Sequence, residues 1–164
     1  MAAMEIRTTG FAHPDAAKLS AEVQQEYVQR YGEGDLTVIH PEHFDPPAGL
    51  FVVGYLDGVP VACGGFRVKQ AGPDDVRDGD GELKRMYVSA SARGRGLSRA
   101  VLRHLEAEAL AAGLTRLILE TGTEQPEAIG LYESEGYRPI TKYGYYRDHP
   151  ESLCYGKELV PAVA

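Results

Sequence analysis

The stretch that decides the fold is ELKRMYVSASARGRGLSRAVLRHLEAEALAA, residues 82–112. Its first seven residues are half apolar and predict a β-strand, and a turn of small residues follows at 89–92. After the run Arg-Gly-Arg-Gly at 93–96, apolar residues recur at helical spacing until Gly113 and predict an amphipathic helix. The stretch therefore predicts a strand, a glycine turn and a helix start in direct succession.

The glycine turn has the features of an anion site. The first N–H groups of a helix have no backbone partner, and the helix dipole adds a partial positive charge at the same end. Glycine also lets the main chain approach a phosphate without a Cβ in the way. Six basic residues and no acidic one lie from Lys84 to Arg103, in a chain with a net charge of -7. This local reversal of sign predicts a polyphosphate site rather than a turn that holds no ligand.

Composition limits the class of protein. The 164 residues with 43% hydrophobic content indicate one globular domain, 1–164, and the charge of -7 argues against nucleic-acid binding. Cys63, Cys154 and the five histidines form no ligand pattern, so we expect no metal. No apolar run reaches membrane-spanning length and no signal sequence opens the chain, so we expect no membrane association and a cytoplasmic location.

Periodicity outside the deciding stretch predicts a mixed α/β domain. Apolar residues at helical spacing predict helices at 14–31 and 125–135, and Asp57-Gly58 predicts a tight hairpin. The predicted strands besides 82–88 are 4–9, 50–56, 59–69, 115–121, 137–141 and 152–159.

Three blocks of this sequence resemble the GNAT superfamily of acetyl-CoA-dependent N-acetyltransferases. The family's motif is Arg or Gln, two residues, Gly, one residue, then Gly or Ala. Here it reads Arg-Gly-Arg-Gly-Leu-Ser, with Ser98 departing at the last position. The block 82–88 resembles the family's fourth strand, and 125–137 resembles its later helix with a tyrosine and a Gly-aromatic step. The resemblance implies a single-domain GNAT-like α/β fold. Its sheet would be mixed but mostly antiparallel, with six to seven strands splayed between the fourth and fifth, flanked by helices.

Two other glycine motifs fit less well. A dinucleotide-binding fingerprint needs a third glycine where this chain has Arg99, and no Gly-Lys-Ser/Thr sequence of a P-loop is present.

The resemblance implies acetyl-CoA as co-substrate and assigns its binding to two adjoining segments. The fourth strand would pair through its main chain with the pantetheine arm, and the turn and first helical residues would hold the pyrophosphate. The residues in these segments are Met86, Tyr87, Val88, Arg93, Gly94, Arg95, Gly96, Leu97, Ser98 and Arg99.

Acetyl transfer to an amine needs a base for the amine and an acid for the departing thiolate. Glu82 is the first candidate base, because it lies beside the expected site and many members of the family carry a glutamate there. The alternative for Glu82 is an ordinary strand-edge carboxylate or an ion pair with Lys84, and Glu120 or a water relay is the reserve. Tyr132 is the candidate acid, since its position matches the family's tyrosine, although a core aromatic would show the same pattern.

For the acceptor side, tyrosines near the end of the first helix and in 143–146 could form an aromatic wall, although loop packing would explain them equally. Arg67 is a candidate to bind a carboxylate of the acceptor, provided that its side chain projects from the face of the strand that carries the site. The candidate acceptor-binding residues are Tyr31, Arg67, Glu120, Tyr143 and Tyr145.

Taken together, these residues predict an N-acetyltransferase that acts on a primary amine of a small molecule. No serine or cysteine is placed beside a histidine base, so we expect direct transfer from acetyl-CoA without a covalent enzyme intermediate. Acetylation of a protein or peptide N-terminus and a catalytically idle acyl-CoA-binding regulatory module are the alternatives. We expect a monomer or a homodimer.

Overall fold

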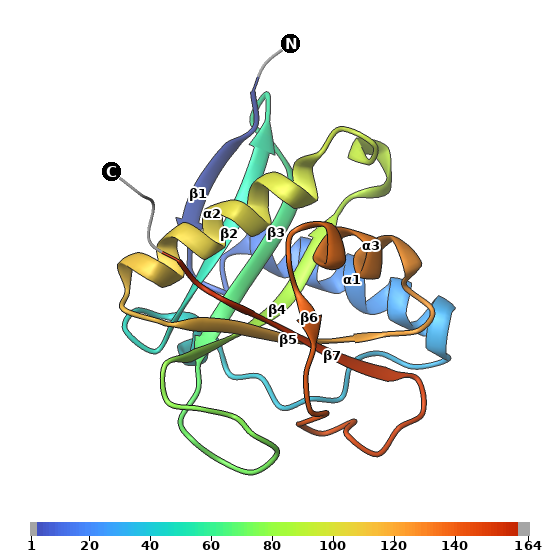
Figure 1. Ribbon diagram of the computed structural model, residues 1–164. Helices are drawn as coiled ribbons and strands as arrows, with labels where there is room; N and C mark the ends of the chain where they lie inside the picture. Colours follow the sequence, from blue (N-terminus) through green and yellow to red (C-terminus); the bar gives the residue numbers. More distant parts are fainter. Residues whose placement is uncertain (1–2, 161–164) are drawn as a thin grey trace.

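One seven-stranded sheet flanked by helices makes up the described part of the chain, residues 3–160 of a computed structural model (Figure 1). Residues 1–2 and 161–164 of the predicted domain lie outside the described residues. The strands are β1 (Glu5–Thr9), β2 (Gly49–Leu56), β3 (Val59–Val68), β4 (Asp80–Val88), β5 (Arg116–Gly122), β6 (Arg138–Pro139) and β7 (Ser152–Glu158). The helices are α1 (Pro14–Tyr31), α2 (Leu97–Ala111) and α3 (Pro126–Ser134), with short 3₁₀ turns at η1 (Pro41–Phe44) and η2 (Ala90–Ala92).

The predicted fold class is confirmed by the strand pairing. The strand order is β1-β2-β3-β4-β5-β7-β6, and every neighbouring pair is antiparallel except β4 and β5. Those two strands pair in parallel only from Asp80–Arg116 to Glu82–Ile118 and then separate. At the closed end the carboxylate of Asp80 accepts hydrogen bonds from the Arg116 guanidinium at 2.7 Å, and both side chains are buried. The sheet is therefore anchored at one end of this pair and splayed at the other.

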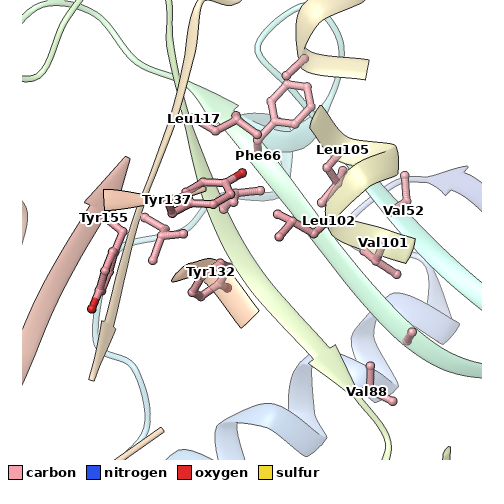
Figure 2. Close-up of a cluster of buried hydrophobic side chains, with 14 of the residues drawn as sticks. Val52, Phe66, Val88, Val101, Leu102, Leu105, Leu117, Tyr132, Tyr137 and Tyr155 are labelled. Carbon is pink, nitrogen blue, oxygen red and sulfur yellow. The ribbon is translucent and has the colours of Figure 1, made fainter. Parts of the chain in front are cut away.

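Helices cover both faces of the sheet. On one face, Val101, Leu102 and Leu105 of α2 pack with sheet residues such as Phe66 and Leu117 (Figure 2). The opposite face carries α1, whose buried residues pack against β2 and η1 (Figure 1). Complete burial of each such side chain stabilises the fold by roughly 1.5–3 kcal/mol. The sheet and its splay are therefore a rigid frame.

Helix α1 has the predicted bounds, and local chemistry explains them. It begins with Pro14, and the Nδ1 of His13 accepts a hydrogen bond from the amide of Asp15 at 3.1 Å. It ends at Gly32, whose φ of 86° is left-handed. The predicted strand at 137–141 is shorter than expected, because only Arg138 and Pro139 pair with β7.

A β-bulge interrupts β4 next to the splay. Cys63 pairs with Tyr87, and Gly65 pairs with Lys84, so β4 has one residue more than β3 between these two pairs. Within the bulge, Arg85 has a φ of 57°, which is uncommon for a residue with a side chain. Bulges re-aim side chains, so the strict alternation of faces along β4 is broken at this point.

Candidate active site

The turn before α2 presents unpaired main-chain amides. Gly94 and Gly96 have φ values of 80° and 76°, a left-handed conformation that L side chains rarely adopt. Gly96 is the N-cap of α2 and provides no side-chain cap. Within residues 3–160 we find no acceptor for the amides of Leu97, Ser98 and Arg99. These donors and the helix dipole are the features that an anion site requires, and anion binding at this turn stays a prediction.

The arginines of this turn differ in their partners. The Nη2 of Arg93 lies 3.0 Å from a carboxylate oxygen of Glu26 on α1. Arg99 donates to Glu135 at the end of α3. Arg95 is exposed and has no ion pair with any described residue. The basic character of the turn is thus partly neutralised by α1 and α3, with Arg95 left unpaired.

A cavity of about 170 Å³ lies where β4 and β5 separate. Its wall is formed by the end of α1, residues 33–35, the splayed parts of β4 and β5, the start of α3 and parts of 146–152. Among the lining residues are Tyr27, Tyr31, Arg85, Glu120, Tyr132 and Tyr146. Met86 of β4 also lines it, so the cavity adjoins the strand segment that the sequence assigns to the pantetheine arm.

Tyr132 lies in the cavity wall, as its predicted role requires. It extends from α3, and its ring makes an edge contact with Tyr137 at a centroid distance of 5.6 Å (Figure 2). Burial raises the pKa of Tyr132 above the ordinary value for a phenol. The raised pKa keeps this phenol protonated near neutral pH and also makes it a weaker acid than an ordinary tyrosine. The acid role of Tyr132 stays a prediction.

Glu82 occupies a different environment from the one its predicted role requires. Its buried carboxylate lies 2.8 Å from the Nε of Arg67 and 4.0 Å from Lys69, and it does not line the cavity. Burial acts to raise the pKa of Glu82, but the positive charges of Lys84, Arg67 and Lys69 hold it below its usual value. A carboxylate held ionised by three cations is a weak proton acceptor.

Glu120 is better placed. It lines the cavity beyond the last β4–β5 pair, and its Oε2 accepts a hydrogen bond from the Ser152 hydroxyl at 3.0 Å. Burial raises the pKa of Glu120, and the charges of Glu82 and Asp35 act in the same direction, although Ser152 and Lys84 oppose them. A raised pKa brings a carboxylate closer to the value that suits a general base near neutral pH.

Of the tyrosines predicted on the acceptor side, Tyr31 lines the cavity and the other two do not. The Tyr31 hydroxyl accepts a hydrogen bond from Gln125 at 3.2 Å, and Gly122 leaves room for it, since a Cβ there would lie 2.0 Å from that oxygen. Tyr143 is buried against Ile118. Tyr145 is exposed, and the next residue, Tyr146, lines the cavity.

Arg67 is directed elsewhere. Besides its contact with Glu82, its Nη1 donates to the carbonyl of Val38 at 2.9 Å, and the residue does not line the cavity. The arginine that does line it is Arg85, which sequence reasoning treated only as one member of the basic run. The signal that could have found Arg85 is the pair of adjacent charged residues, Lys84 and Arg85, within a strand that is otherwise mostly buried.

Comparison with known proteins places the chain in a family. A model of the Acetyltransferase (GNAT) family matches residues 16–137. The chain belongs to this family. The GNAT resemblance predicted from the motifs is thereby confirmed, and the chain is an acyltransferase with the GNAT fold.

Solved structures agree with this membership. An acyl-CoA N-acyltransferase structure from Klebsiella pneumoniae is 27% identical, with a TM-score of 0.76 over 96% of this chain and 98% of that one. Salmonella typhimurium yncA, solved with its cofactor acetyl-CoA, has a TM-score of 0.73 over 99% of this chain and 98% of that one. At 19% identity, it shows the shared fold alone.

Among curated relatives, an IAA acetyltransferase of Azospirillum brasilense is 39% identical over 66% of this chain and 67% of its own length. Human N-acetylaspartate synthetase is 28% identical over 77% of this chain, and the match spans only 40% of that protein.

Residues 3–160 lack the features of two other kinds of site. No helix there is both long and apolar enough to cross a bilayer. The same residues contain no cluster of three or more His, Cys, Asp or Glu side chains suited to a metal ion.

Proposed function

We propose that this GNAT acetyltransferase moves the acetyl group of acetyl-CoA directly to a primary amine of a small molecule. The observation that carries the proposal is the cavity at the splay, which brings Glu120 and Tyr132 together beside the open edge of β4. One carboxylate with a raised pKa and one protonated phenol supply the base and the acid that the reaction needs.

The donor side rests on main-chain groups. Acetyl-CoA supplies the thioester, and the amides of 97–99 with Arg93 and Arg95 would hold its pyrophosphate. Because β4 leaves β5 after Glu82, the main chain of Met86, Tyr87 and Val88 has no strand partner on that edge and can pair with an extended arm.

For the chemical step, we propose Glu120 as the base in place of Glu82. Glu120 takes the proton of the amine as its nitrogen bonds to the acetyl carbon. Tyr132 donates its proton to the sulfur as the carbon–sulfur bond breaks, and solvent then reprotonates the phenol. Glu82 instead holds Arg67 in place through their buried ion pair.

Closure of the acceptor side supports a small molecule over a protein N-terminus. The segment 32–49 covers this side: the amide of Leu36 donates to the Tyr146 hydroxyl at 2.7 Å, and Asp35 pairs with Lys84 at 3.3 Å. One relative, human N-acetylaspartate synthetase, is named for an acetylated amino acid, which is also a small molecule. The cytoplasmic location and the monomeric or homodimeric state stay predictions from the sequence.

The test combines calorimetry with acetyl-CoA and a thiol-release assay across amino acids, other small amines, aminoglycosides and peptides. We expect binding of acetyl-CoA and turnover on a small amine. Turnover on peptides alone would favour the N-terminal acetyltransferase, and binding without any turnover would favour the idle module. Absence of acetyl-CoA binding would overturn the whole proposal.

A further inference from the structure

Arg85 is a buried cation whose side chain has no hydrogen-bond or ion-pair partner within residues 3–160. Its side chain lines the cavity, and the residue is only 8% exposed. The Nε and Nη1 atoms are fully buried and make no hydrogen bond, and no carboxylate of residues 3–160 lies within ion-pair distance of the guanidinium. Burying a charge without a counter-charge is strongly unfavourable, so this arrangement calls for a partner.

The β4 bulge explains how Arg85 reaches the cavity. Because the alternation of faces breaks there, two consecutive residues, Lys84 and Arg85, both project toward the side of the sheet that carries α1. Lys84 pairs with Asp35 just after α1, and the charge of Arg85 acts on the pKa of both Tyr27 and Asp35. The Sγ of Cys63 donates to the Arg85 carbonyl at 3.2 Å and helps to hold the bulge.

Asp35 and Glu120, two of the carboxylates that line the cavity, already have other partners. Asp35 accepts from Lys84 at 3.3 Å through one oxygen and from the amide of Thr37 at 2.9 Å through the other. Glu120 accepts from Ser152. The charge of Arg85 is therefore left without a counter-charge among the described residues, and a group that enters the cavity can supply one.

We propose that Arg85 binds a carboxylate of the acceptor, so that the acceptor is an amine carrying a carboxylate, of the α-amino acid type. This inference rests on the proposed function and narrows its substrate class. The planar fork of arginine matches a carboxylate with two parallel hydrogen bonds. The specificity of the enzyme would then reside in one side chain at the β4 bulge.

Charge complementarity favours a zwitterion over a phosphate or another multivalent anion. Besides Arg85, the charged residues that line the cavity are Lys84, which pairs with Asp35, and four carboxylates. The carboxylates, which would repel a group of two negative charges, are Glu33, Asp35, Glu120 and Glu151. A protonated amine is attracted by the same carboxylates, and the single negative charge of the acceptor would face Arg85. Tyr27, Tyr31 and Tyr146 line the rest of the wall and leave room for an apolar side chain.

The experiment compares L-amino acids with their own carboxamides as acceptors, in the parent enzyme and in Arg85→Gln and Arg85→Lys. In the parent we expect kcat/KM for the best amino acid to exceed that for its carboxamide by about 100-fold. Arg85→Gln should bring this ratio to about one by raising KM for the amino acid. Arg85→Lys keeps the charge but not the fork and should give an intermediate ratio.

Equal use of acids and carboxamides by the parent, or an unchanged ratio in Arg85→Gln, would overturn the assignment. Circular dichroism and thermal unfolding verify that the variants fold. If Arg85→Gln does not fold, the ratio measured with Arg85→Lys decides the test.

Calorimetry with the L-amino acids alone separates this inference from the proposed function. If binding depends on Arg85 while no amine is acetylated, the carboxylate site stands and the enzymatic proposal falls. If amines without a carboxylate are the preferred substrates, the enzymatic proposal stands and the carboxylate site falls.

Discussion

The donor turn and the acceptor cavity are built in opposite ways. The turn is one continuous stretch, 93–99, that offers main-chain amides at a helix start. The cavity is assembled from side chains of α1, 33–35, β4, β5, α3 and 146–152, which lie far apart in the sequence. A site made of backbone depends on local conformation, whereas a site made of distant side chains depends on register and packing. The first therefore suits a co-substrate shared by a family, and the second suits an acceptor that differs between members.

The electrostatics of the two regions also differ. At the turn, Arg93 is partly exposed and pairs with Glu26 across solvent-accessible space. In the cavity, Arg85 is buried with no partner among the described residues. Substitutions should consequently have large effects in the cavity and smaller ones at the exposed arginines.

The largest effect is expected at the base. Glu120→Gln should lower kcat by about 1000-fold, within the range for loss of general base catalysis, and leave KM for acetyl-CoA unchanged. The base acts as a carboxylate, and burial raises the pKa of Glu120, so parent activity should fall as pH drops through that raised pKa. This acid limb should lie above the range of an ordinary glutamate and be absent from the pH–rate profile of the variant.

Glu82→Gln is the matched control for Glu120→Gln. It leaves Arg67 as a buried cation without its counter-charge and should lower the free energy of unfolding by about 3 kcal/mol, while the acid limb persists. Denaturant unfolding and a pH–rate profile measure the two effects. A lost limb in Glu82→Gln with an intact one in Glu120→Gln would return the base to Glu82.

The next effect belongs to the donor turn. Gly96→Val should weaken acetyl-CoA binding by about 100-fold in calorimetry, because the left-handed backbone is strained with a branched side chain and the first-turn amides shift. Gly113, at the other end of α2, has a φ of 86° and open space around it. Gly113→Val therefore imposes a similar backbone strain away from the turn and serves as the control. Equal loss of binding in both variants would show a general loss of stability instead of a donor site.

A smaller effect is expected for the acid. Tyr132→Phe keeps the ring contact with Tyr137 but removes the proton donor, so kcat should fall by about tenfold to 100-fold, since water can replace part of the function. Tyr137→Phe removes only the hydrogen bond to Glu106 and should leave kcat near that of the parent. If pre-steady-state and steady-state rates of Tyr132→Phe match those of the parent over the pH range, the acid is another group.

The smallest effect is expected at the exposed ion pair. Glu26→Gln frees Arg93 for a phosphate and should tighten acetyl-CoA binding by no more than about fivefold, because an exposed pair contributes at most about 1 kcal/mol. Glu158→Gln removes the same charge from the exposed pair with Arg77 and serves as the control. Weaker binding in Glu26→Gln would mean that this carboxylate positions Arg93 for the donor.

The sequence by itself determined the fold class, the bounds of α1, the glycine turn before α2 and the family. These features depend on local properties: helical periodicity, the left-handed backbone of Gly94 and Gly96, and the unpaired amides of a helix start. Such properties depend on a few residues that are neighbours in the chain, so they can be predicted without knowing which strand or helix packs against them.

Only the tertiary structure decided the environment of the charged side chains. Glu82 and Glu120 are both glutamates within predicted strands. In the structure, Glu82 is buried against Arg67, whereas Glu120 lines the cavity. Arg67 pairs with Glu82 away from the cavity, whereas Arg85 lines the cavity at a one-residue bulge in β4. Burial, pKa and orientation are set by contacts between residues distant in the chain, and no local pattern encodes them.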